Sequence, residues 1–106
     1  MTEPHLQQSA SQQNLKDMVQ ENLQNQPDTT FLDLQDQEIE DLNVIMDMLP
    51  QFEFLEELNL SNNRITTVAS LSELKSLTTL NISGNRIEEL KNLNLPVLTH
   101  LFLNFN

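Results

Sequence analysis

LEELNLSNNRI at residues 55–65 is followed 22 residues later by LTTLNISGNRI at residues 77–87, and these two stretches decide the fold. The same spacing of leucine and asparagine returns in LTHLFLNFN at residues 98–106, offset by 21 residues. A weaker copy precedes them, with Gln37 in the asparagine position. Self-similarity at a fixed period of roughly 20 to 50 residues is the signature of a repeat architecture.

Each copy contains a short stretch in which aliphatic and polar residues alternate, as in Leu58-Asn59-Leu60. Alternation at period two predicts a strand with its leucines on one side and the intervening residues on the other, so each repeat adds one strand to a parallel sheet. The return to the next strand has 11 to 13 residues, which leaves room for extended chain and 3₁₀ turns but not for a full α-helix. The asparagine amide, with two donors and an acceptor, can satisfy backbone groups of its own and the neighbouring turn. The predicted asparagine ladder consists of Asn63, Asn85 and Asn106.

The repeats divide the chain into two parts. Residues 29–106 form the repeats 29–54, 55–76 and 77–97 and a partial repeat 98–106, whereas residues 1–28 form a tail rich in Gln, Ser and Asn. A capping helix is predicted over residues 12–25, with Ser11 as its N-cap and Pro27 beyond its end. Its apolar stripe is narrow, so it either covers the first repeat, docks another protein, or is a transient helix in a flexible tail. The stripe consists of Leu15, Met18, Val19 and Leu23.

The stretches 55–65, 77–87 and 98–106 resemble the leucine-rich-repeat family, and the period is similar to that of its short, 22-residue intracellular subclass. The resemblance implies an α/β solenoid with short parallel strands on a concave face, 3₁₀ or short helical returns on a convex face, and a role in binding other proteins. Known members of the subclass include phosphatase regulators, dynein-associated axonemal subunits and splicing-complex subunits. The first repeat departs from the pattern because it is longer and lacks the asparagine, and no C-terminal cap follows residue 106. We therefore expect the chain to be the N-terminal part of a longer solenoid.

Charge narrows the choice of partner. Sixteen acids against five bases give a formal net charge of −11, which repels phosphate backbones and anionic lipid, so neither nucleic acid nor a membrane surface is an expected partner. A protein with a basic surface is favoured, although the acids also fit a solvated flank that keeps the chain in solution. The chain has no cysteine and no signal-like start, which favours a reducing setting, the cytoplasm, with the nucleus or the axoneme as alternatives.

The sequence offers little for catalysis or for binding metal. His5 lies in the N-terminal tail and His100 in the last predicted strand, so the two histidines are too far apart to form one catalytic site. The single glycine, Gly84, is explained by turn geometry. The acidic run DLQDQEIED at residues 33–41 lacks the glycine and the terminal glutamate of a calcium-binding EF-hand loop. We therefore expect no enzymatic activity, no cofactor and no metal.

The expected function is that of a non-catalytic protein-interaction module or scaffold subunit that binds its partner on the concave face, within a larger assembly. The alternatives are a regulatory subunit of an enzyme such as a phosphatase, or an axonemal, dynein-associated subunit. Two aromatic residues on the strands are candidate anchors, unless the N-terminal helix covers the first of them. The predicted partner-binding residues are Phe31, Asp33, Glu57, Asn59, Thr79, Asn81, His100 and Phe102.

Overall fold

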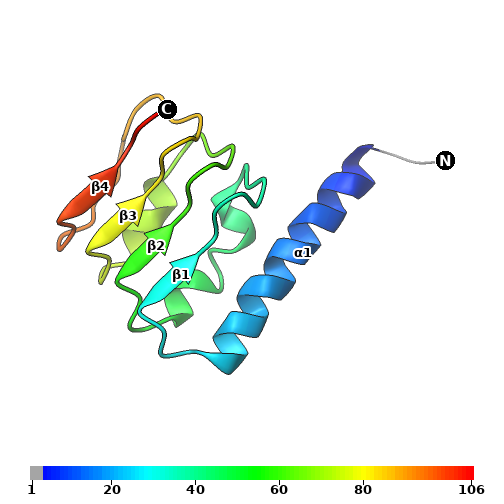
Figure 1. Ribbon diagram of the computed structural model, residues 1–106, viewed down its shortest axis with the longest axis horizontal. Helices are drawn as coiled ribbons and strands as arrows, with labels where there is room; N and C mark the ends of the chain where they lie inside the picture. Colours follow the sequence, from blue (N-terminus) through cyan, green and yellow to red (C-terminus); the bar gives the residue numbers. More distant parts are fainter. Residues whose placement is uncertain (1–3) are drawn as a thin grey trace.

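A computed structural model describes the backbone of residues 4–106 and the side chains of residues 12–106. The N-terminal helix lies beside the first of four strands, and the 3₁₀ segments lie behind the strands (Figure 1). The strands form one parallel sheet in the order β1-β2-β3-β4. The elements are α1 (Pro4–Asn25), β1 (Phe31–Asp33), η1 (Leu42–Val44), η2 (Leu49–Gln51), β2 (Glu57–Asn59), η3 (Ala69–Glu73), β3 (Thr79–Asn81) and β4 (His100–Phe102).

The strand register follows the repeat register. Leu32 pairs with Leu58, Leu58 with Leu80, and Leu80 with Leu101. The side chains of the first three of these leucines are buried and that of Leu101 is partly buried. The predicted α/β solenoid is therefore confirmed, with one strand for each repeat.

The returning segments differ between repeats. The first return contains η1 and η2, and the second contains η3. In the third, the described chain makes two turns, closed by bonds from Leu93 N–H to Leu90 O and from Leu98 N–H to Leu95 O. The prediction of 3₁₀ returns thus holds for the first two repeats, while the third is built from turns alone.

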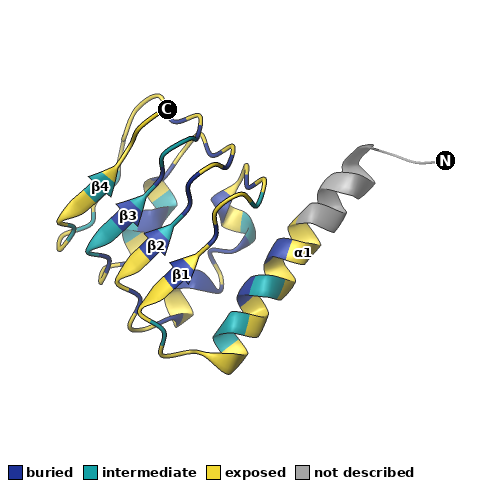
Figure 2. Ribbon diagram, viewed as in Figure 1, coloured by how far each residue is buried: buried dark blue, intermediate teal, exposed yellow. Residues whose placement is uncertain are grey.

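One continuous hydrophobic core runs through the repeats and includes part of α1. Leu15 and Val19, four residues apart and so on one face of α1, are 4% and 0% exposed within the same cluster as Leu32 and Leu58. Figure 2 shows this buried face of α1 turned toward the strands, with exposed residues on its other side. The helix therefore covers the open side of the first repeat.

The bounds of α1 differ from the predicted ones. The helix begins at Pro4, eight residues before the predicted start, so Ser11 lies within it and is not its N-cap. Proline fits the first turn of a helix because the N–H that it lacks would have no partner there. The helix ends at Asn25, two residues before Pro27, as expected of a proline beyond a helix end.

Candidate functional site

The outward side of the four strands, here called the concave face, carries two rows of side chains. In the first row Phe31 pairs with Glu57, Glu57 with Thr79, and Thr79 with His100. The second row lies two residues further along each strand. Its members are Asp33, Asn59, Asn81 and Phe102. The structure thus brings all eight predicted partner-binding residues onto one face.

Three side chains of the second row are each held by the same type of hydrogen bond to the nearby backbone. Asp33, Asn59 and Asn81 each accept, through Oδ1, the backbone N–H two residues ahead, at 3.2, 3.0 and 3.0 Å. Asn59 Nδ2 also contacts Gln35 Oε1 at 3.5 Å. Because the oxygens hold the strand ends, the amide nitrogen of Asn81, one N–H of the Asn59 amide and the second oxygen of Asp33 make no bond to another described residue.

His100 has a defined orientation at the end of the first row. The Thr99 hydroxyl oxygen lies 3.1 Å from the carbonyl oxygen of Thr78, and the His100 Nδ1 lies 3.0 Å from the same hydroxyl oxygen. The hydroxyl carries one proton, so it donates either to Thr78 or to the ring, and the ring tautomer decides which of Nδ1 and Oγ1 is the donor.

The two aromatic residues of the concave face are both about half exposed. Phe31 is 47% exposed and Phe102 is 45% exposed, at opposite ends of the sheet. The alternative that α1 covers Phe31 does not hold, because α1 packs through Leu15 and Val19 into the core behind the strand.

The three predicted ladder asparagines make backbone bonds across the repeats. Asn63 and Asn85 are each 7% exposed, whereas Asn106 is exposed. Through Oδ1, Asn63 accepts the N–H groups of Gln37 and Ile39 at 2.9 and 3.0 Å, and Nδ2 donates to Leu34 O at 3.0 Å. All three of these partners belong to the repeat before. The ladder therefore holds each repeat by the asparagine of the one after it.

The other two ladder asparagines also bond to the repeat before their own. Asn85 accepts the N–H of Ile65 at 3.0 Å, and Asn106 accepts the N–H of Ile87 at 3.1 Å. In addition, each asparagine donates to its own repeat, as Asn85 does to Ile82 O at 2.9 Å.

The residue before each ladder position has a left-handed backbone. Asn62, Gly84 and Phe105 have φ of 57°, 69° and 65°. Asparagine and glycine adopt this conformation readily, but for a bulky residue it is unusual. The alternation of apolar and polar residues gives no signal for it, so the conformation of Phe105 could not be predicted from the pattern.

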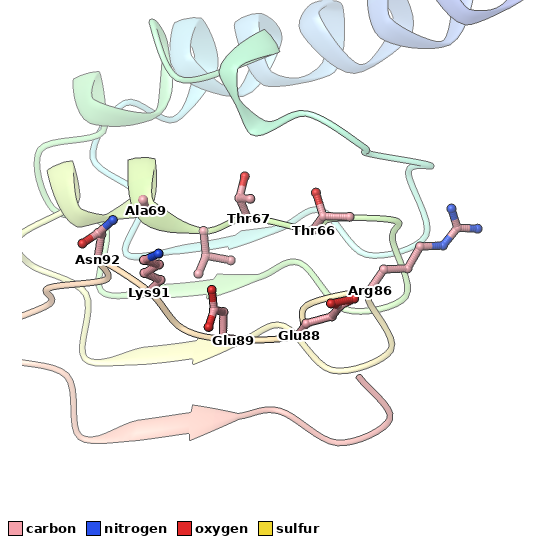
Figure 3. Close-up of a pocket in the computed structure, with 9 residues that line it drawn as sticks. Thr66, Thr67, Ala69, Arg86, Glu88, Glu89, Lys91 and Asn92 are labelled. Atoms are coloured by element: carbon pink, nitrogen blue, oxygen red, sulfur yellow. The ribbon is translucent and has the colours of Figure 1, made fainter.

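A pocket with a cavity volume of about 550 Å³ lies away from the concave face. Figure 3 shows that the second and third returns line it and that the strands do not. The lining residues are Thr66, Thr67, Val68, Ala69, Arg86, Glu88, Glu89, Lys91 and Asn92. Its charged groups are balanced, with Arg86 and Lys91 against Glu88 and Glu89. None of the predicted partner-binding residues lines this pocket.

The described residues contain neither a metal-binding cluster nor a membrane-spanning helix. No group of three or more His, Cys, Asp or Glu side chains in the described part of the chain is placed to hold a metal ion. Among the described helices, none combines the length and the apolar character needed to span a membrane.

Comparison with known proteins agrees with the repeat pattern. A family model described as Leucine Rich repeats (2 copies) matches residues 53–94. That range contains β2 with its return, β3 with most of its return, and two of the three ladder asparagines. No curated protein matches the chain.

Proposed function

Since this chain is a leucine-rich-repeat protein, we propose that it is a scaffold subunit that binds a partner protein on its concave face. Repeats of this family serve as protein-interaction modules, and function is set by the side chains on the fold. The observation that carries the proposal is the pair of half-exposed aromatics, Phe31 and Phe102, on one sheet face. Exposed aromatic side chains gain little from intramolecular packing and are frequent anchors of interfaces.

The charges of the same face favour a basic partner. Asp33 and Glu57 lie beside Phe31, and neither row of the face contains a lysine or an arginine. Carboxylates of this kind accelerate association with a basic surface and orient it, more than they add affinity. The lack of cysteine fits a role in a reducing compartment, which we propose to be the cytoplasm.

Affinity capture with matched variants tests the proposal. The wild-type chain is compared with Phe102→Ala and Asp33→Asn on the concave face and with the double variant Glu88→Gln, Glu89→Gln as the convex control, in which both glutamates are exposed. We expect a direct partner to lose about 30-fold in affinity with Phe102→Ala, the equivalent of about 2 kcal/mol. The convex control should bind as wild type does.

The opposite result would overturn the proposal. If the convex control loses the partner while both concave variants keep it, the binding site lies on the other side of the solenoid. Assaying the captured partner for an enzymatic activity, with and without the chain, then separates a scaffold from the alternative, a regulatory subunit of an enzyme such as a phosphatase.

A further inference from the structure

The two ends of the concave face differ in chemistry, and this difference bears on how a partner lies on it. At the β1 end, the register partner of Phe31 is Glu57, so a carboxylate lies next to an exposed ring. Asp33 lies on the same face, two residues along the strand. A ring face flanked by carboxylates suits the side chain of arginine or lysine, which is attracted by the ring and by the acids together.

The two carboxylates at this end are available to a partner. No side-chain hydrogen bond or ion pair joins Glu57 to another of the described residues, and Asp33 accepts only the N–H of Gln35, at 3.2 Å. The salt bridge found in the described part of the chain, Arg64 to Glu40 at 3.9 Å, lies elsewhere, on exposed side chains. A cation that arrived at Phe31 would therefore displace no existing partner.

The β4 end carries an aromatic ring in its second row and His100 in its first, and it has no acid, lysine or arginine within residues 98–106. Phe102 stands where β1 to β3 have Asp33, Asn59 and Asn81. Phe105, in the turn after β4, is 90% exposed and has a φ of 65°. A bulky residue in this conformation is unfavourable for the fold, and its exposed ring packs on little of the chain. Both rings at this end suit an apolar group on a partner.

The charged residues outside the concave face show the same difference between the two ends of the sheet. The first repeat, residues 29–54, has no lysine or arginine, whereas in residues 77–106 Arg86 and Lys91 balance Glu88 and Glu89. The field thus favours a basic group near β1 over one near β4. The acids of the first repeat are Asp33, Asp36, Glu38, Glu40, Asp41, Asp47 and Glu53.

We propose that the concave face binds a partner segment in one orientation, with an arginine or lysine over Phe31 between Asp33 and Glu57 and an apolar side chain at Phe102. This inference rests on the proposed function. Three strand spacings of about 4.8 Å, with an offset of two residues along the strands, separate the two rings by roughly 16 Å. An extended segment covers that distance in about four to six residues.

Selection from a random library of displayed 12-residue peptides tests the inference, because it assumes nothing about the sequence of the partner. The targets are the wild-type chain, the double variant Asp33→Asn with Glu57→Gln, the variant Phe102→Ala, and the convex control Glu88→Gln with Glu89→Gln. We expect peptides enriched on the wild-type chain and on the control to carry a basic residue four to six positions from a large apolar one.

Each concave variant should remove one half of this preference. On the Asp33→Asn, Glu57→Gln target, enrichment of basic residues should fall at least tenfold while apolar residues stay enriched. On Phe102→Ala the reverse is expected. An enriched peptide, synthesised and measured by fluorescence anisotropy, should bind the wild-type chain less tightly as salt is raised and should lose that dependence on the first variant.

Several results would overturn the inference. Basic enrichment that is unchanged on the Asp33→Asn, Glu57→Gln target removes the cationic site. A wild-type pool without the basic and apolar pair, or with no enriched peptide, contradicts the orientation while leaving the proposed function to the capture experiment. Peptides lost on the convex control and kept on both concave variants contradict the proposed function as well.

Discussion

The first and second repeats are held in different ways. In the second repeat the carbonyl of Leu60 accepts from two asparagines, Asn63 and Asn85, each at 2.9 Å. In the first repeat the equivalent carbonyl of Leu34 accepts from Asn63 alone, at 3.0 Å. The amide of Gln37, in the asparagine position, donates instead to Gln35 O at 3.1 Å. An inner repeat is thus held by its own asparagine and the next one, but the first only by the next.

The first repeat has other support. Its longer return contains two 3₁₀ segments, η1 and η2, and α1 packs Leu15 and Val19 into its core. In the first repeat, α1 and the asparagine of the second repeat thus take the place of the ladder bonds that Gln37 does not make.

The largest expected effect comes from removing the helix contact. Replacing Leu15, which is 4% exposed, by alanine should destabilise the chain by about 3–4 kcal/mol, because it leaves a cavity between α1 and the first repeat. Urea unfolding monitored by circular dichroism measures this. The exposed Gln20→Ala on the same helix is the control and should stay within about 0.5 kcal/mol of wild type. A change that small for Leu15→Ala would mean that α1 does not support the repeats.

The next effect distinguishes the two buried asparagines. Asn63→Ala leaves the N–H groups of Gln37 and Ile39 and the carbonyl of Leu34 without partners. Asn85→Ala leaves only the N–H of Ile65 without a partner, because Leu60 O keeps its bond from Asn63 and Ile82 O keeps its bond from Asn106. Unpaired buried groups are unfavourable, so we expect losses of about 3 and about 1 kcal/mol respectively. Equal losses in urea unfolding would contradict a ladder directed toward the preceding repeat.

A smaller effect is expected at the turn before Asn85. Gly84 has a φ of 69°, and a Cβ at this position would collide with the side chain of Asn62. Gly84→Ala should therefore destabilise the chain by about 2 kcal/mol. Adding Asn62→Gly removes the collision and should restore part of the stability, leaving the unfavourable φ. If thermal unfolding finds no recovery in the double variant, the collision is not the cause.

The smallest effect should have the opposite sign. Phe105 has the same left-handed turn conformation as Gly84, with its ring 90% exposed. Phe105→Asn loses almost no packing and relieves the backbone, so we expect a gain of up to about 1 kcal/mol and a rise of a few degrees in Tm. Asn62→Phe, the reverse change at the equivalent turn of the second repeat, should lower Tm. A lower Tm for Phe105→Asn would show that the ring stabilises the fold.

The concave face illustrates what could be predicted about the site. Period-two alternation placed Phe31, Glu57 and Phe102 on the outer side of their strands, and all three are exposed there. The bonds that orient Asp33, Asn59 and Asn81 were not predicted, since an Asx side chain can bond to water, to its own backbone or to a neighbour with the same spacing. That a partner binds to this face remains a prediction.

The sequence by itself determined the repeat, the strand register and the side of each strand that faces the core, because all three follow from local spacing that recurs in successive repeats. Leu58, Leu80 and Leu101 recur at 22 and 21 residues and pair directly in the sheet. Only the tertiary structure decided that α1 extends from Pro4 and closes the first repeat, that the asparagines reach back to the repeat before, and that Phe105 takes a left-handed turn. These features depend on which groups of two different segments meet, and spacing within one segment carries no information about that.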